Sequence, residues 1–230
     1  MKARELYRQA IEIDPSFTMA YFRLSFLTFD QGLRDEYRKK TLQGLDRLSE
    51  RERLKVGSSA ASWKGDDQRA LTLQEELVAR YPDEPDAYVR LSVLYRTVLG
   101  DTEKAMQTVE RGVRAVPTDG PLRNYYAYQL LYAGRFDEAI RQLEAYAQFA
   151  PREPNPHDSL GEAYLMMGRP EEAIAKYTAA IDLDGTFGGL TKGERGRMPF
   201  SDATTTPWPT LRRRKRSSPT AKRPLSSVSC

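Results

Sequence analysis

A short glycine-led pattern recurs along most of this chain at an almost constant interval. Residues 134–140 read Gly-Arg-Phe-Asp-Glu-Ala-Ile, and residues 168–174, which begin 34 positions later, read Gly-Arg-Pro-Glu-Glu-Ala-Ile. The same frame begins at Gly65 and Gly100, so the four glycines are spaced 35, 34 and 34 residues apart. A fixed period of this length is the signature of structural repeats that stack on their neighbours. We therefore expect an array of similar units, and no catalytic motif organises the chain.

Each unit from Gly65 onward divides into two amphipathic helices joined at the glycine. Glycine adopts a left-handed or otherwise tight backbone at little cost, so it suits the bend between the helices. Prolines at 82, 117 and 151 close the second helices, because proline cannot continue a helical hydrogen-bond ladder. An alanine five residues after each glycine lets the two helices approach closely. We expect the space between them to be filled by Leu91, Tyr95, Leu130, Leu143, Leu160, Tyr164 and Tyr177.

The chain begins with a helix that lacks a preceding partner. Residues 3–14, followed by Pro15, carry apolar side chains mainly on one helical face, namely Leu6, Tyr7, Ala10, Ile11 and Ile13. On the repeat frame this segment corresponds to the second helix of a unit. We therefore expect that a first helix upstream of it is missing from the sequence.

The first complete unit is the least regular. Its first helix is expected over residues 18–30, and Gln31-Gly32 makes the turn into a second helix that runs to about Leu48. Tyr37 stands where the other units have alanine, and no proline closes the helix. We therefore expect looser or reshaped packing in this unit.

The next helix has a clear start signal. In the run Ser-Glu-Arg-Glu, Ser49 and Glu52 are spaced as a capping box, in which each side chain satisfies a backbone donor at the helix start. The resulting helix should run to about Lys64. Small residues at Gly57 and over 58–62 favour close contact with a neighbouring helix.

Charge is distributed unevenly along the 230 residues. Residues 188–230 hold 10 of the 36 basic residues and 2 of the 32 acidic residues, which gives this segment a formal charge of +8 and the remainder −4. Its prolines, its threonine run and the basic stretch 212–216 offer little apolar area to offset the entropy of ordering. We expect a disordered basic tail.

Cysteine and hydropathy patterns favour a cytoplasmic location. The only cysteine is Cys230, so no intrachain disulfide framework is possible, and a reducing compartment fits that usage. The N-terminal residues lack the apolar core of a signal peptide, and no stretch approaches the roughly 18 apolar residues of a membrane span.

The most complete unit identifies a family. Its signature residues are Leu160-Gly161-Glu162-Ala163-Tyr164, Gly168, Ala173-Ile174, Tyr177 and Ala180. They agree at fixed offsets and again one period away, and they resemble the tetratricopeptide repeat, although Gly185 replaces the usual proline. The resemblance covers residues 1–187 and implies an all-α, right-handed superhelix, or solenoid, of about five helix pairs. The expected units are 17–50, 51–84, 85–119, 120–153 and 154–187, with 1–16 an orphan second helix and 188–230 the tail.

No group of residues supports catalysis or metal binding. The sole histidine, His157, has no cysteine nearby and only Asp158 adjacent, so neither a zinc site nor a nucleophilic triad can be assembled around it. An EF-hand with Gly185 in sixth place would put Thr191 where a bidentate glutamate belongs. Residues 188–193 lack the Gly-Lys-Ser/Thr order of a phosphate loop. We expect no enzyme activity, no metal and no cofactor.

The family resemblance directs attention to the concave face, which first helices line and where extended or helical peptides bind. The candidate partner-binding residues on the matched positions are Phe22, Phe26, Phe29, Val89, Val93, Arg96, Asn124, Tyr128, Tyr132, Asp158 and Glu162. We favour the Asn124, Tyr128 and Tyr132 stripe, because amphipathic aromatics supply contact area and hydrogen bonds at modest entropic cost. The alternative is that these aromatic stripes belong to the core. The basic clamp that binds carboxyl-terminal chaperone peptides is not visible.

These observations predict a non-catalytic scaffold for protein–protein interaction, which binds a protein or peptide ligand in a preformed groove. The alternative is a regulatory or sensor fragment of a larger signalling kinase, cyclase or transcriptional regulator, because residues 48–54 look like a junction found in repeat regions attached to such bacterial proteins. A third hypothesis is nucleic-acid or anionic-membrane contact through the basic tail, although a solvated tail is favoured. Uncapped end helices also permit self-association.

Overall fold

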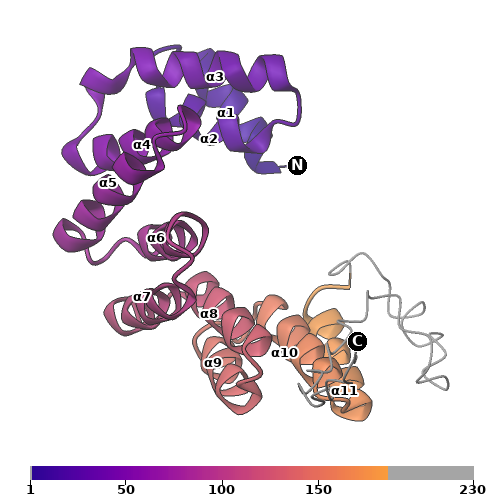
Figure 1. The fold of residues 1–230 in the computed structure, drawn as a ribbon. Coiled ribbons are helices and arrows are strands. Elements are labelled where there is room, and N and C mark those ends of the chain that lie inside the picture. The colour runs from indigo at the N-terminus through magenta and orange to yellow at the C-terminus, as the bar shows by residue number, and fades with distance from the viewer. Residues whose placement is uncertain (1, 186–230) are drawn as a thin grey trace, which may run out of the picture.

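The computed structural model describes residues 2–185, which form an elongated stack of helices (Figure 1). Within this range there are eleven α-helices, one short 3-10 helix over Leu45–Arg47, and no strand. The helices are α1 Lys2–Ile13, α2 Thr18–Leu27, α3 Gln31–Gln43, α4 Glu50–Trp63, α5 Asp67–Arg80, α6 Pro85–Val98, α7 Thr102–Ala115, α8 Gly120–Tyr132, α9 Phe136–Phe149, α10 Asn155–Met166 and α11 Pro170–Leu183.

Consecutive helices pair into hairpins, and the hairpins stack. The pairs are α2 with α3, α4 with α5, α6 with α7, α8 with α9, and α10 with α11. The second helix of a pair also packs against the first helix of the next, as α5 does on α6 and α9 on α10, and α1 packs on α2 in the same way. This is the predicted all-α, right-handed superhelix of about five helix pairs (Figure 1).

The four frame glycines form the bends within the hairpins. Their φ angles are +77° at Gly65, +67° at Gly100, +76° at Gly134 and +73° at Gly168. These angles lie in the left-handed region that glycine occupies without the steric cost of a Cβ atom. The prediction of a tight glycine bend is confirmed at all four positions.

The interior of the stack is continuous from α4 to α11. The predicted alanines at 70, 105, 139 and 173 are all buried, and so are Leu91, Leu130 and Leu143. One hydrophobic cluster joins these residues through every hairpin from α4 onward, with Tyr177 packed against its end. Each unit therefore completes its core with its neighbours, as repeat architectures require.

The first unit departs from this pattern and from our prediction. Helix α3 ends at Gln43, five residues before the expected Leu48, and the chain then passes through Gly44 and a 3-10 helix. The Thr18 hydroxyl donates to the Gly44 carbonyl at 3.2 Å. A Cβ atom at position 44 would overlap the Thr18 side chain. This close approach of α2 to the end of α3 explains the early termination.

The start of α3 also differs from the later bends. Gly32 was expected in the turn, but it lies inside the first turn of α3. The N-cap is Asp30, whose carboxylate accepts from the Leu33 backbone amide at 2.7 Å. Capping by a residue before the glycine leaves Gly32 in a helical conformation, so the left-handed bend is absent here.

A separate, smaller core holds the first unit to α4. It consists of Phe22, Leu48 and Val56, with Met19, Leu45 and Trp63 packed against it. Direct contact between α3 and α4 is slight compared with that between α5 and α6. The expected reshaping of this unit therefore takes the form of a core that is separate from the core of the later units.

The predicted start of α4 is correct. Ser49 accepts a hydrogen bond from the Glu52 backbone amide, and the Glu52 carboxylate accepts from the Ser49 amide at 2.9 Å, so the capping box is complete. The helix ends at Trp63, with Lys64 as its C-cap.

Some predictions fall on residues that the structure does not describe. The tail at 188–230, the glycine-rich stretch 188–193, the basic run 212–216 and Cys230 all lie outside residues 2–185. Among the helices that the structure does describe, none combines the length and apolar character needed to cross a membrane.

Candidate partner-binding surface

Helix α8 presents a stripe of amphipathic side chains beside its buried face. Asp119 caps the helix by accepting from the Leu122 amide at 2.7 Å, and Pro121 stands in its first turn. Leu122, Tyr126 and Leu130 are then buried against neighbouring helices. Asn124, Tyr128 and Tyr132 follow one another at every fourth residue, so they share a different stripe of the same helix.

Tyr128 is fixed to the next first helix. Its hydroxyl donates to the Glu162 carboxylate of α10 and lies 3.5 Å from the Ser159 hydroxyl. Burial raises the pKa of the Tyr128 hydroxyl, and the hydrogen bond to Glu162 raises it further. The hydroxyl therefore stays protonated and acts as a donor, which holds the half-buried ring in one orientation.

Tyr132 and Asn124 are less constrained. The Tyr132 side chain is 72% exposed, and its ring centroid is 6.4 Å from that of Tyr128 with an interplanar angle of 38°. Asn124 is half-buried, and its Oδ1 atom is shielded from solvent without a hydrogen-bond partner among the described residues. The stripe thus combines a fixed aromatic ring, an exposed one and an unsatisfied amide oxygen.

The candidate residues on the flanking helices are connected to α8. Val89 and Val93 on α6 are half-buried, whereas Arg96 is exposed and donates to the Gln129 side chain of α8 at 2.9 Å. On α10, Asp158 and Glu162 are both half-buried. The Arg96 and Tyr128 hydrogen bonds therefore link α6 to α8 and α8 to α10. We call Val89, Val93, Arg96, Asn124, Tyr128, Tyr132, Asp158 and Glu162 the central stripe.

The three phenylalanines of α2 and its following turn do not behave alike. Phe22 is only 3% exposed and lies in the small core, so it is unavailable for direct contact with a partner. Phe26 is 54% exposed and Phe29 is 92% exposed. The alternative interpretation of these residues as core is thus correct for Phe22 alone.

Trp63 belongs with these aromatics, and our sequence interpretation missed it. Its ring centroid lies 6.1 Å from that of Phe26 and 6.2 Å from that of Phe22. The Arg38 guanidinium sits 5.0 Å above the indole. A signal was present, because Trp63 precedes Gly65 by two residues as Tyr132 precedes Gly134.

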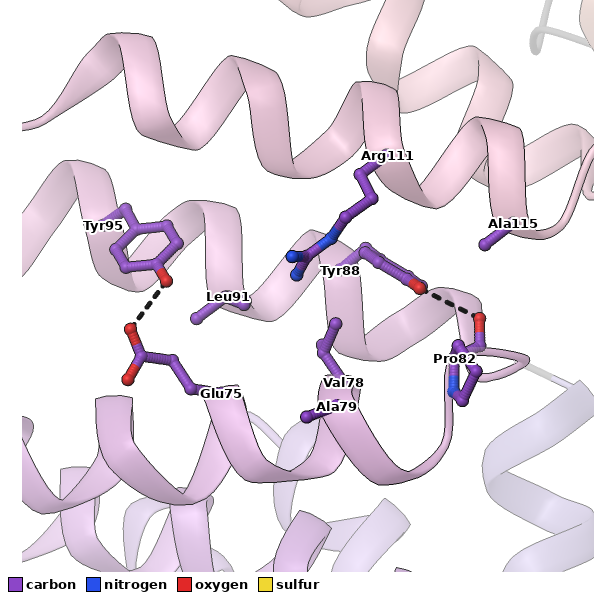
Figure 2. Close-up of a pocket in the computed structure, with 9 residues that line it drawn as sticks. All are labelled: Glu75, Val78, Ala79, Pro82, Tyr88, Leu91, Tyr95, Arg111 and Ala115. Carbon is purple, nitrogen blue, oxygen red and sulfur yellow. Dashed lines mark hydrogen bonds between the residues drawn. The ribbon is translucent and has the colours of Figure 1, made fainter.

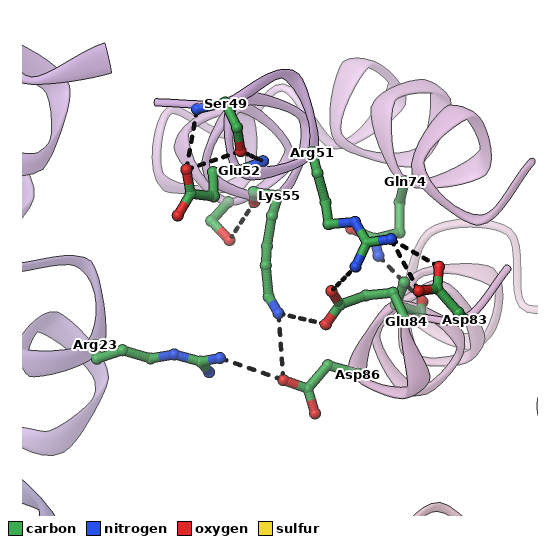
Figure 3. Close-up of polar contacts among 11 residues, drawn as sticks. Arg23, Ser49, Arg51, Glu52, Lys55, Gln74, Asp83, Glu84 and Asp86 are labelled. Atoms are coloured by element: carbon green, nitrogen blue, oxygen red, sulfur yellow. Dashed lines mark hydrogen bonds and ion pairs between the residues drawn. The ribbon is translucent and has the colours of Figure 1, made fainter. Parts of the chain in front are cut away.

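A polar network connects α2, α4 and the start of α6 (Figure 3). Lys55 of α4 contacts Glu84 at 2.7 Å and Asp86 at 3.3 Å, while Arg23 of α2 reaches Asp86 at 3.5 Å. Arg51 pairs with Asp83 at 2.7 Å. The network joins three successive first helices by ion pairs, and each of its carboxylates has a basic partner.

The only histidine of the sequence, His157, lies on α10. Burial lowers the pKa of His157, with a further contribution from Lys176, so the ring is neutral near pH 7. Its Nδ1 atom is buried without a hydrogen-bond partner among residues 2–185. Within that range, no three His, Cys, Asp or Glu side chains are placed to hold a metal ion together.

Comparisons with known proteins agree with this geometry. A family model described as tetratricopeptide repeat matches residues 83–182. A thermophilic tetratricopeptide-repeat protein of Thermus thermophilus shares 24% identity over 73% of this chain and 91% of that one, with a TM-score of 0.54. A MamA double mutant from Desulfovibrio magneticus RS-1 shares 18% identity over 73% of this chain and 94% of that one, with a TM-score of 0.50.

A comparison with curated protein sequences finds no match. At these sequence identities, the similar structures support a conclusion about the fold alone. Together with the left-handed glycine bends, the buried alanines and the stacked hairpins, the family match leads to one conclusion. Residues 83–182 of this chain belong to the tetratricopeptide-repeat family, and the described helices share the fold of such proteins.

Proposed function

We propose that the chain is a scaffold for protein–protein interaction that binds a peptide segment of a partner along the central stripe. The observation that carries this proposal is the exposure of Tyr132, a large amphipathic side chain, beside the fixed ring of Tyr128. Tyrosine is enriched among the residues that dominate binding free energies at interfaces. A single exposed tyrosine would be unremarkable in a surface, but this one continues a stripe across three consecutive first helices.

The proposed mechanism relies on preorganisation. The hydrogen bond from Tyr128 to Glu162 fixes the ring before a partner arrives, so less side-chain entropy is lost on binding. Tyr132, whose side chain is largely exposed, would supply apolar contact area.

Charge along the stripe sets the orientation of the partner in this proposal. The α6 end carries the exposed Arg96, whereas the α10 end carries Asp158 and Glu162. A partner segment with an acidic residue near α6 and a basic residue near α10 would complement both ends, and opposite orientations would place like charges together.

The test uses peptides selected from a displayed random library for binding to the full chain. For the tightest peptide, Kd is measured by calorimetry for the native chain and for Tyr132→Ala. We expect Kd to rise about 30-fold, corresponding to the loss of about 2 kcal/mol that defines a hot spot. Circular dichroism checks that helicity is unchanged.

Phe149→Ala is the matched control, because Phe149 is also an exposed aromatic but lies at the end of the second helix α9. Its Kd should equal that of the native chain. An unchanged Kd for Tyr132→Ala, or an equal loss for Phe149→Ala, would reject the central stripe as the binding surface.

A further inference from the structure

A cavity of about 450 Å³ lies between α5, α6 and α7 (Figure 2). Its α6 residues are Tyr88, Leu91 and Tyr95, which occupy a different stripe from Val89 and Val93 because the two sets are offset around the helix. The remaining lining residues are Glu75, Val78, Ala79, Pro82, Arg111 and Ala115. The cavity is therefore separate from the central stripe.

One residue that lines the cavity, Tyr88, packs against a departure from the repeat at Gly112. Gly112 of α7 lies against the Tyr88 ring, and a Cβ atom at position 112 would sit 2.6 Å from Tyr88 Cγ. The matched residue one period later is Tyr146, which is buried and packs against Gly120. At that junction the ring comes from the second helix, whereas beside Gly112 the Tyr88 ring of the first helix occupies the corresponding space.

Most polar groups in the cavity already have partners. The Tyr88 hydroxyl donates to the Pro82 carbonyl at 3.0 Å, and the Tyr95 hydroxyl donates to Glu75 at 2.7 Å. Lys104 lies 4.0 Å from the same Glu75 carboxylate and 4.3 Å from the centre of the Tyr95 ring. Glu75 is thus engaged by two groups.

Arg111 is the exception. Its guanidinium lies 5.7 Å from the centre of the Tyr88 ring and extends between Tyr88 and Tyr95 into the cavity, as Figure 2 shows. Among the described residues, no carboxylate lies within 4.0 Å of it, whereas Arg114 on the same helix pairs with Glu110 at 2.7 Å. The cavity therefore combines aliphatic and tyrosine side chains with one exposed cationic group, Arg111, that has no carboxylate partner among the described residues.

The geometry points to a ligand site for an apolar carboxylate. The carboxylate would pair with Arg111, whose planar donors match its two oxygens, and the apolar group would lie against Leu91, Val78 and the tyrosine rings. The volume falls within the range of known small-ligand pockets, which are mostly apolar with few polar groups. A cationic ligand would meet Arg111 instead, and a neutral one would leave it unpaired.

Two sources share this chemistry, a small organic acid and the carboxyl terminus of a polypeptide that ends in an apolar residue. The experiment uses four probes with the ¹⁵N-labelled full chain, namely 3-phenylpropionate, 3-phenylpropionamide, and a short peptide ending in phenylalanine with either a free or an amidated terminus. Amide chemical shifts report the site. The site does not depend on the central stripe, so its failure would leave the proposed function intact.

We expect both free acids to shift amide signals in residues 88–95 and 111–115, and both amides to bind at least about tenfold more weakly, because a charge-assisted hydrogen bond is lost. Arg111→Gln should weaken the binding of both acids by the same factor. Arg114→Gln is the matched control and should leave their affinity unchanged. Tighter binding of the peptide acid assigns the site to a chain terminus, and equal or tighter binding of 3-phenylpropionate assigns it to a small acid.

Three results would overturn the inference. The first is equal binding of acids and amides, and the second is equal losses for the two arginine variants. The third is the absence of shifts in these residues with every probe. Melting curves for both variants exclude unfolding as a cause of lost binding.

Discussion

The first unit and the later repeats are built from similar helix pairs, yet they differ in how those pairs join. From α4 to α11 a single buried cluster runs through every hairpin. Before α4 the core is a separate group around Phe22, Leu48 and Val56, and α3 hardly touches α4. Helical hairpins alone are thus insufficient for regular stacking. The side chains at the bend, and those where the two helices of a hairpin approach each other, determine whether the hairpins stack regularly.

Two matched positions account for much of the difference. The later bends have a left-handed glycine followed by a buried alanine, as at Gly134 and Ala139. The first unit has a helical Gly32 and a tyrosine, Tyr37, in the corresponding places. The bulk of Tyr37 and the missing left-handed bend change how α3 can approach its neighbours.

The largest expected effect separates the two cores directly. Leu130→Ala in the continuous core should lower the free energy of unfolding by about 2–5 kcal/mol, because it leaves a cavity in a fully buried site. Urea unfolding followed by circular dichroism measures the loss. Leu48→Ala removes the same atoms from the small core, and its effect, followed by amide hydrogen exchange, should remain confined to α1–α4. If Leu48→Ala destabilised α6–α10 as much as Leu130→Ala does, the two cores would not be separate.

Within the continuous region, the ion pair between Lys55 of α4 and Glu84, the N-cap of α6, should be the next most sensitive contact. Lys55 and Glu84 have side chains only 14% and 17% exposed. Lys55→Met would leave the Glu84 carboxylate without its close cation, and we expect a loss of about 1.5–3 kcal/mol. The same change in an exposed i,i+4 pair, Arg114→Met, should cost about 0.5 kcal/mol or less. Thermal unfolding of both variants tests this ranking, and similar losses would contradict it.

The bend glycines should respond with opposite signs. Gly134→Ala forces a Cβ atom into the left-handed region and should cost about 1–2 kcal/mol. Gly32→Ala replaces a helical glycine whose added Cβ would meet only Asp30 Oδ1, at an ordinary contact distance of 3.5 Å, so it should stabilise by about 0.5–1 kcal/mol. Denaturation midpoints measure both, and a loss of stability in Gly32→Ala would contradict a helical backbone at this position.

The smallest expected effect concerns an ion pair that follows the bend. A hydrogen bond from Arg135 lowers the pKa of the Glu138 carboxyl below its usual 4.5. Because folding lowers this pKa, the contribution to stability is complete above about pH 4.5 and is lost as the pH falls through the folded-state pKa. The first unit has Leu33 in the place of Arg135 and lacks the pair.

Arg135→Gln should return the Glu138 pKa to its ordinary value, as measured by an NMR titration of the side-chain carboxyl. The matched pair on α11, Arg169 with Glu172, should titrate as before. Since solvent reaches both carboxyls, only a small change in acid stability is expected. An unshifted Glu138 titration in the variant would show that another group lowers the pKa.

Local chemistry explains which features of the fold were predictable from sequence. The glycine bends and the Ser49 capping box depend on residues a few positions apart, so their patterns indicated both correctly. The end of α3 at Gln43 depends on Thr18, which is 26 residues away from Gly44. No local signal carries that contact, and the expected end at Leu48 was wrong for this reason.

The sequence predicted which residues of the candidate surface share a helical stripe, but it did not predict the contacts that those residues make. Helical spacing grouped Asn124 with Tyr128 and Tyr132, but the hydrogen bond from Tyr128 to Glu162 depends on how α8 and α10 are rotated against each other. Phe22 and Phe26 share a helix and spacing, yet only one is buried. The cavity beside Arg111 depends on how α5, α6 and α7 pack together, which repeat matching alone did not reveal.

Hydrogen exchange of the full chain tests the central claim most directly, namely that α4–α11 form one continuous body to which α1–α3 are loosely joined. Repeats coupled through shared interfaces open together. The account predicts that amides in α6, α8 and α10 exchange with one common, high opening free energy, while those in α2 and α3 exchange sooner and independently. Protection of α3 equal to that of α8 would contradict it.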